Sequence, residues 1–476
     1  MIDYYHFIVS LIFIGCVAFF STCYFIIPFV KKVALAYGVI DDPKKSTRKI
    51  HKRTVPYLGG AAIYIGFLST IVIYYVFLRR LHSSIEYPEW FLAYLAGGAL
   101  VLIIGTLDDV YDISALKKLL TQIGIACLTY IAGIQIDHLN LPIVGLIELG
   151  PVSFVFTIFI ITVLMNAINI IDGMDGLASG VVLVATSANL VLALHLELYL
   201  TAIIAAILVA TLLAFIRHNW HPATIFLGDG GSLLISYLLT VIMIQNVQAA
   251  NKASQVFLPV LVLFYPFIDI VFAMARRFLR GKPVMSADKA HLHHFLMQVG
   301  ISHEGCVKLV ILFSAGLSIV AIFLIYDLVV YGLILLTLLL VLLAIFFIIT
   351  GYFEPKLLNR YLQHRPILKT LNSYKNFTLT KIKYVSSADE MWQIILDVAK
   401  EYKFKGLIWK AGSGEKKMFG DTTEVPTFHK ESMFFSGGEV LYKTDNELDE
   451  DVRSEIESVV KVIVIALDKR VKSLDN

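Results

Sequence analysis

The sequence has 476 residues, of which 58% are hydrophobic and 16% are charged, and its formal net charge is +3. This composition excludes an ordinary soluble globular protein and is typical of a membrane protein, and so small a charge gives no indication of nucleic-acid binding. A membrane crossing needs about 20 apolar residues. Apolar runs of this length predict about eleven transmembrane helices, at 6–30, 57–78, 90–107, 118–135, 152–170, 175–195, 199–216, 230–247, 256–275, 306–326 and 329–350.

Basic residues predict how these helices are oriented. The connections on one side of the predicted bundle carry 15 Lys and Arg residues, and those on the other side carry 3. Loops rich in Lys and Arg remain in the cytoplasm. We therefore expect the N-terminus outside and the C-terminal tail in the cytoplasm.

The hydrophobic pattern stops after Thr350. The following residues are polar, mixed in charge and numerous enough for a small domain. Their patterning predicts helices at 388–401 and 449–471 and strands at 404–410 and 440–443. The expected fold is thus an all-α polytopic membrane domain over residues 1–350, followed by a small cytoplasmic α/β domain of unknown role over residues 351–476.

Acidic side chains end the third predicted helix. Asp108, Asp109 and Asp112 lie within five residues, and Lys118 follows at a distance from which it could reach a phosphate. Ionisable groups at a membrane edge cost free energy unless they serve a site. Carboxylates this close repel one another unless a cation lies among them or one is protonated. The alternatives are a solvated helix cap and, for Lys118, a lysine that extends to the membrane surface.

The fifth predicted helix ends in a more specific pattern. Asn166 and Asn169 are three residues apart, and Asp172 and Asp175 repeat that spacing. An amide at the end of an apolar run is costly without a partner. Simple termination of a helix would need only one such side chain, so this cluster is a candidate site.

Asp229 follows Gly228 at the start of the eighth predicted helix. It could simply cap that helix. Placed opposite Asn169, it would instead complete a set of oxygen ligands for Mg²⁺, which takes its remaining ligands from water and substrate phosphate.

Histidines follow arginines in the last long cytoplasmic connection. Three histidines within four residues, with Arg276 and Arg277 before them, suit the binding of a diphosphate or a sugar. Zinc is the alternative, although no cysteine accompanies the cluster. The histidines are His291, His293 and His294.

The motifs DDVYD, NAINIIDGMDGLA, FLGDGGS and HLHH, in this order, resemble the polyprenyl-phosphate N-acetylhexosamine-1-phosphate transferases of glycosyltransferase family 4. The resemblance covers about residues 1–350. It implies a bacterial inner-membrane enzyme that transfers N-acetylhexosamine-1-phosphate from a UDP-sugar to undecaprenyl phosphate and releases UMP. This reaction would initiate a cell-envelope polysaccharide. The implied partners are the UDP-sugar, the polyprenyl phosphate and the lipid bilayer, with a homodimer as one alternative for the assembly.

The resemblance also implies roles for the candidate residues. Asp229 and Asn169 would hold Mg²⁺, or Mn²⁺ in its place. Asp108 and Asp109 would position or deprotonate the lipid phosphate, which would attack directly or through an aspartyl-phosphate. Asp175 would lie by the uracil. The catalytic set is Asp108, Asp109, Asp172 and Asp175, and the substrate-binding set is Lys118, Asn166, Asp175, Arg276, Arg277, His291, His293 and His294.

The identity of the sugar and two other functions stay open at this point. HLHH favours the UDP-N-acetylhexosamine branch, with GlcNAc as the expected sugar. Residues 284–288 read VMSAD where GlcNAc members often have Pro-Phe-Ser, which leaves GalNAc and deoxy-aminosugars as alternatives. A membrane transporter is a second hypothesis. A degenerate transferase fold that acts as a sensor through residues 351–476 is a third.

Overall fold

The structure of the chain is a computed structural model. It describes residues 4–41, 54–78, 88–111, 113–141, 144–250, 261, 263–279, 296–350, 369–370, 373–384, 388–401, 406–411, 416–420, 433–435, 438–443, 456, 459–463 and 466. The chain divides into two compact units, one of residues 1–271 and 290–350 and the other of residues 272–289 and 351–476.

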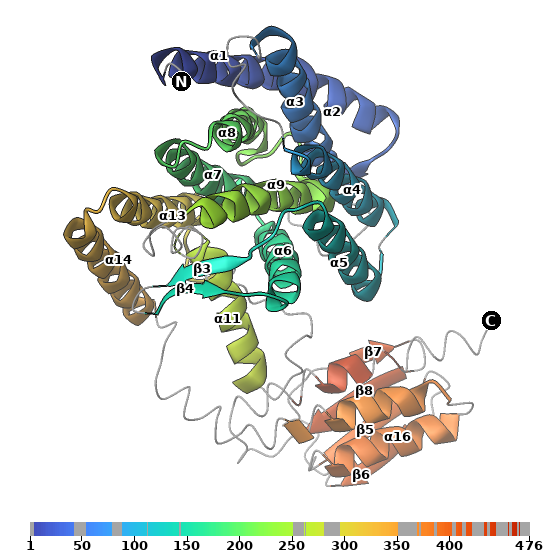
Figure 1. The fold of residues 1–476 in the computed structure, drawn as a ribbon. Helices are drawn as coiled ribbons and strands as arrows, with labels where there is room; N and C mark the ends of the chain where they lie inside the picture. Colours follow the sequence, from blue (N-terminus) through green and yellow to red (C-terminus); the bar gives the residue numbers. More distant parts are fainter. Residues whose placement is uncertain are drawn as a thin grey trace. The chain divides into compact units, whose positions relative to one another are not determined.

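The expected all-α membrane fold is confirmed (Figure 1). Each of the eleven predicted spans corresponds to a helix. The helical segments are α1 (Tyr4–Ser21), η1 (Thr22–Ile26), α2 (Ile27–Ala36), α3 (Gly59–Ile73), η3 (Tyr74–Leu78), α4 (Trp90–Tyr111), α5 (Ala115–Ile131), α6 (Val152–Ile171), α7 (Leu177–His195), α8 (Tyr199–Asn219), α9 (Gly228–Ala249), α11 (Phe264–Leu279), α13 (His303–Ile325) and α14 (Val329–Ile349).

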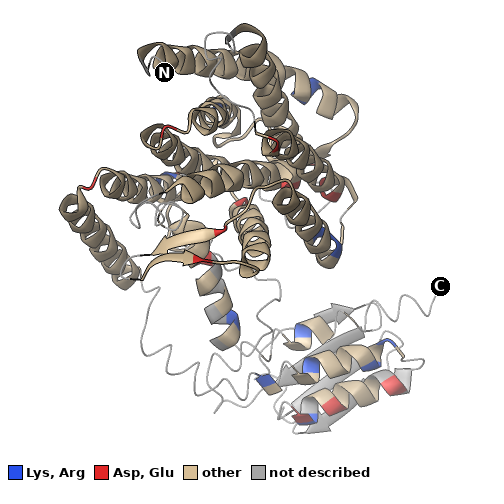
Figure 2. Cartoon of the chain, in the orientation of Figure 1, with Lys and Arg blue, Asp and Glu red and all other residues tan. Residues whose placement is uncertain are grey.

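Two of these helices are shorter than a full crossing. In the described part of the chain, nine helical segments are long and apolar enough to span a membrane. Helix α5 has 17 residues and α11 has 16. Basic residues stand in the first turn of α5 and the last turns of α11, and they limit the apolar length of each. Figure 2 shows that charged residues are few in the first unit and lie mostly near helix ends.

The first span is longer than expected. It continues without a break from α1 through the π-helical turn η1 into α2, and so ends at Ala36 rather than at residue 30. Pro28 stands in the first turn of α2, where its missing N–H is tolerated after the π-helical turn. Lys31 and Lys32 are compatible with the end of a span because their long stems can reach the membrane surface.

Helix α9 lies at the centre of the first unit. It lies beside α3, α4, α6, α7 and α8 (Figure 1). Nearly all its side chains after Asp229 are buried. The hydroxyl groups of its serine and threonine residues donate within the helix, as where Ser236 donates to the carbonyl of Leu233 and Thr240 to that of Ser236. The first turn of α9 is therefore held from several sides, and this turn carries Asp229.

Two short antiparallel pairs lie in the first unit. Strand β1 (Ile40–Asp41) pairs with β2 (Val55–Pro56), and β3 (His138–Leu141) pairs with β4 (Gly145–Glu148). The last residue of β2 is hydrogen-bonded to the segment before α9, because the N–H of Phe226 donates to the carbonyl of Pro56 at 2.9 Å. This hydrogen bond links the first loop to the Asp229 region.

The second unit contains the predicted α/β elements. Helix α16 spans Ala388–Glu401, as predicted, and the described residues of the predicted helix at 449–471 are helical. The sheet is antiparallel in the order β6-β5-β8-β7. Its strands are β5 (Gly406–Ala411), β6 (Lys416–Gly420), β7 (Met433–Phe435) and β8 (Gly438–Lys443). The sequence predicted β5 and β8 but not β6 and β7, which lie between them along the chain.

Candidate active site

Asp229 occupies the first turn of α9, where glycines let neighbouring helices come close. Gly228 has a φ of +74°, a left-handed conformation that favours glycine. On α4, a Cβ at Gly105 would lie 2.5 Å from the Cα of Gly230. On α3, a Cβ at Gly60 would collide with the backbone of Gly231. The position of Asp229 therefore depends on backbone-to-backbone packing.

This packing predicts a sharp effect of one methyl group. We expect Gly105→Ala to destabilise the protein by about 1–3 kcal/mol, because a backbone neighbour cannot move aside as a side chain can. Gly124→Ala is the matched control, since a Cβ at Gly124 meets nothing within 4 Å. Thermal unfolding in detergent measures both. Equal stability of the two variants would contradict the tight crossing.

Asp109 binds the start of α9. Its two carboxylate oxygens accept the N–H of Asp229 at 2.9 Å and the N–H of Gly230 at 3.2 Å. The first N–H groups of a helix have no partner inside the helix, and a carboxylate there is favoured by the helix dipole. Asp109 thus caps α9 from α4 and fixes the backbone that carries Asp229.

Lys118 connects three of the candidate residues. Its Nζ lies 2.8 Å from Asp108 Oδ2 and donates to Asp229 Oδ2 at 2.6 Å and to Asn169 Oδ1 at 3.3 Å. Only 13% of the Lys118 side chain is exposed, so these contacts are poorly screened by water. Carboxylate and amide oxygens from α4, α6 and α9 therefore surround one positive charge.

Asn169 and Asn166 differ in their surroundings although they are one turn apart. The Nδ2 of Asn169 donates to Asp229 Oδ1 and to Ser232 Oγ, both at 2.8 Å. The Nδ2 of Asn166 donates instead to Gln122 Oε1 and to the carbonyl of Thr162. Asn169 belongs to the carboxylate cluster, and Asn166 joins α6 to α5.

An open cleft lies next to this cluster. Its volume is about 420 Å³, and its walls include four of the predicted acidic residues together with Asp41 and Asn219. The four are Asp109, Asp172, Asp175 and Asp229. Asn169 and Lys118 adjoin it through their contacts with Asp229, and Asp108 adjoins it through its ion pair with Lys118. The ends of helices far apart in the sequence thus converge on one site, as the sequence predicted.

Asp172 is the residue after α6, outside the apolar spans. Burial, followed by the nearby carboxylates of Asp229, Asp109 and Asp175, raises the pKa of Asp172 well above its usual value. A carboxyl group of this kind costs stability once the pH rises above its unfolded pKa of about 3.9.

The raised pKa predicts that Asp172→Asn has a higher Tm than the parent protein near pH 7. The difference should shrink as the pH falls and vanish below about pH 4, where Asp172 is protonated in the folded and the unfolded chain. Thermal unfolding with EDTA present measures this difference at each pH. A difference in Tm that does not change with pH would contradict the assignment.

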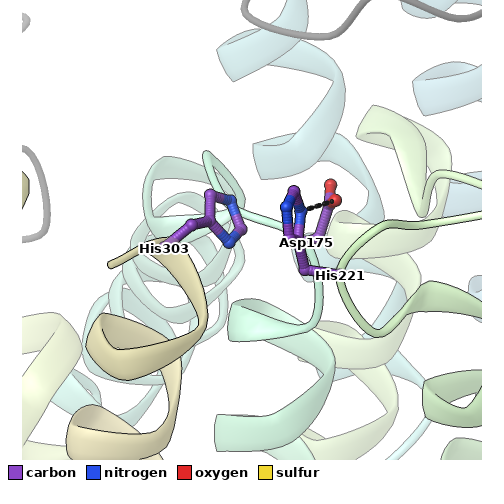
Figure 3. A group of neighbouring side chains, drawn as sticks. All are labelled: Asp175, His221 and His303. Atoms are coloured by element: carbon purple, nitrogen blue, oxygen red, sulfur yellow. Dashed lines mark hydrogen bonds and ion pairs between the residues drawn. The ribbon is translucent and has the colours of Figure 1, made fainter. Parts of the chain in front are cut away.

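His221 and His303 join Asp175 at the rim of the cleft (Figure 3). His221 Nδ1 lies 2.8 Å from Asp175 Oδ2, and the rings of the two histidines stack with 4.2 Å between centroids. Sequence reasoning missed both histidines because neither belongs to one of the four motifs. The available signal was position, since His221 lies eight residues before Asp229 and His303 begins a span on the same side.

Asn219 was also missed. Its Oδ1 accepts from the N–H of Gly176 at 3.0 Å and from Ser179 Oγ at 3.1 Å, and its Nδ2 donates to the carbonyl of Ile225 at 3.0 Å. These bonds tie the turn of Asp175 to the segment that leads to Asp229. Asn219 therefore acts as a positioning residue.

The remaining predicted residues lie in the second compact unit or outside the described residues. Arg276 and Arg277 lie in α11, in the second compact unit. The predicted residues His291, His293 and His294, and Asp112 of the first motif, lie outside the described residues.

Residues 90–247 match the model of the family described as glycosyl transferase family 4. The chain is 34% identical over 302 residues, 63% of this chain and 81% of the relative, to a probable undecaprenyl-phosphate N-acetylglucosaminyl 1-phosphate transferase of Bacillus subtilis (strain 168). It is 34% identical over 311 residues, 61% of this chain and 76% of the relative, to a decaprenyl-phosphate N-acetylglucosaminephosphotransferase of Mycolicibacterium smegmatis. It is 29% identical over 309 residues, 62% of this chain and 78% of the relative, to an undecaprenyl-phosphate alpha-N-acetylglucosaminyl 1-phosphate transferase of Escherichia coli (strain K12).

Proposed function

Because this chain belongs to glycosyl transferase family 4, with the polyprenyl-phosphate N-acetylglucosaminyl 1-phosphate transferases as relatives, we propose that it transfers GlcNAc-1-phosphate from UDP-GlcNAc to undecaprenyl phosphate and releases UMP. The observation that carries the proposal is the convergence of Asp108, Asn169 and Asp229 around Lys118 beside an open cleft. An oxygen of the lipid phosphate would attack the phosphorus attached to the sugar. The bond from this phosphorus to the oxygen that bridges the two phosphates would break, and the bridging oxygen would leave with UMP and keep the electron pair.

The residues fit a role for Mg²⁺. Asp229 and Asn169, together with Asp108, offer the carboxylate and amide oxygens that Mg²⁺ prefers, and the Lys118 ammonium group already makes contact with all three. The bound ion would neutralise charge on the diphosphate.

The other contributions come from the side chains. Phosphoryl transfer depends on positioning and charge neutralisation more than on covalent chemistry. Lys118 would stabilise negative charge on a phosphate oxygen. Asp109 would keep Asp229 in place through its bonds to the first turn of α9. Asp175 would contact the nucleotide at the rim of the cleft.

The charge distribution supports a proposal for the location of the reaction. The site lies at the end of the bundle whose predicted loops are rich in Lys and Arg. This supports a site on the cytoplasmic face of a bacterial inner membrane, where a nucleotide sugar would be available. The product would be the first lipid-linked intermediate of a cell-envelope polysaccharide.

The test is Mg²⁺-dependent release of UMP by purified protein with undecaprenyl phosphate. UDP-GlcNAc, UDP-GalNAc and a UDP-deoxy-aminosugar are supplied separately, with UDP-glucose as a donor that lacks the acetamido group. We expect the highest kcat/KM with UDP-GlcNAc. A higher kcat/KM with another sugar would correct the donor, and no release with any donor from folded protein would overturn the proposed reaction.

A further inference from the structure

Three metal-ligating side chains meet on the rim of the cleft from distant parts of the chain. Asp175 lies in the turn between α6 and α7, His221 lies after α8, and His303 is the first residue of α13. One ligand atom from each lies within 4.8 Å of the other two (Figure 3).

The local contacts hold these side chains together. Asp175 Oδ2 accepts the N–H of Ala223 at 3.1 Å and lies 2.8 Å from His221 Nδ1. The His303 ring stacks on the His221 ring at an angle of 27°. Among the described residues, the buried Nδ1 of His303 has no hydrogen-bond partner. A buried nitrogen without a partner is costly, so a ligand that engages it would be favoured.

The donor set differs from the one around Asp229. Two imidazoles and one carboxylate are ligands that bind Zn²⁺ and related transition-metal ions, whereas Mg²⁺ takes oxygen ligands. Three protein ligands beside an open cleft leave a fourth position for water or another ligand. We propose that Asp175, His221 and His303 form a binding site for a transition-metal ion of the Zn²⁺ class.

Binding requires a small adjustment of the side chains. Zinc–nitrogen distances are about 2.0–2.1 Å, so the ligand atoms of a four-coordinate ion lie about 3.3 Å apart. Rotation of the two imidazoles must bring the ligand atoms closer than the present 4.8 Å limit. His221 can rotate because 45% of its side chain is exposed.

An ion in this position would link three segments that line the cleft. It would join the turn of Asp175, the loop of His221 and the start of α13, close to Asp172. Its occupancy would thus limit the movement of the rim and alter the charge that an entering anion meets. The Zn²⁺ class of ion would act here in addition to the Mg²⁺ proposed for Asp229.

The test is calorimetric titration of tag-free, full-length protein with Zn²⁺ in the presence of excess Mg²⁺, which fills sites that prefer oxygen. We expect one Zn²⁺ per chain at this site. His221→Gln and His303→Gln should each weaken binding by at least about tenfold. His195→Gln is the matched control, because His195 ends α7, contacts the Tyr326 ring in a T-shaped arrangement and lies at the opposite end of that helix from Asp175.

Two further measurements keep the test decisive. Thermal unfolding without metal shows that each variant is folded. Asp175→Asn, in which the amide oxygen can still accept the Ala223 N–H, provides a third variant that should also lose affinity. Absence of saturable Zn²⁺ binding by the parent, or unchanged affinity in either histidine variant, would overturn the proposal. Because the readout is binding, the result does not depend on whether UMP is released.

Discussion

Replacing Asp229 by asparagine is expected to lower kcat for UMP release by about a hundred- to a thousandfold. The substitution keeps the size of the side chain but removes the charge that pairs with Lys118 and that, in the proposed reaction, would hold Mg²⁺. The rate is measured at saturating UDP-GlcNAc and undecaprenyl phosphate over a range of Mg²⁺ concentrations.

Asp327→Asn is the matched control for this substitution. Asp327 follows α13, at the opposite end of that helix from His303, and has a φ of +60° that asparagine also tolerates. The control should keep the activity of the parent protein. If Asp229→Asn keeps more than about a tenth of the parent kcat, Asp229 is not part of the reacting site.

Replacing Lys118 by methionine is expected to lower kcat/KM by about a hundredfold. Methionine preserves much of the apolar stem but leaves Asp108 and Asp229 without the positive charge between them. The control is Lys117→Met, one residue earlier on an exposed surface of α5. Steady-state kinetics of both variants, with UDP-GlcNAc varied, measures the effect, and equal losses in the two would contradict a specific role for Lys118.

The same variant separates two roles of Lys118. If the ammonium group only balances the carboxylates, its removal should tighten Mg²⁺ binding and leave the KM for UDP-GlcNAc unchanged. If it also contacts a phosphate, its removal should raise the KM for UDP-GlcNAc or lower kcat even at saturating Mg²⁺. Binding of Mn²⁺, followed by its electron paramagnetic resonance signal, reports the metal affinity without turnover.

The sequence was sufficient to predict most of the cluster because topology constrains it strongly. Helices that alternate in direction bring every second connection to the same side of the membrane. Asp108, Asn169 and Asp229 all lie at such ends, and the structure places all three in contact with Lys118. No detail of side-chain packing is needed for that prediction.

The different contacts of neighbouring residues were harder to predict from the sequence. Asp108 and Asp109 are neighbours in the sequence and point about 100° apart on a helix. Only the packing of α4 against α9 decides that Asp108 faces Lys118 while Asp109 caps α9. Likewise, Asn166 and Asn169 share one face of α6, yet only Asn169 reaches Asp229.

The histidines and the short strands had no local signal. His221 and His303 meet because the end of α8 and the start of α13 both lie beside the turn that precedes α7. That neighbourhood is a property of tertiary packing. Strand β6 reads Lys-Lys-Met-Phe-Gly, which lacks the alternation of polar and apolar residues that identifies a strand.

The central position of α9 separates the reaction from the surrounding lipid. The apolar window of α9 is 94% buried, whereas that of α14 is 11% buried. When bilayer thickness changes, helices in contact with lipid tilt or shift to match it. Such adjustment falls first on outer helices such as α14, while Asp229 moves only if α9 moves against its neighbours. The geometry of the reacting groups should therefore persist as a bacterium changes the length and saturation of its fatty acids.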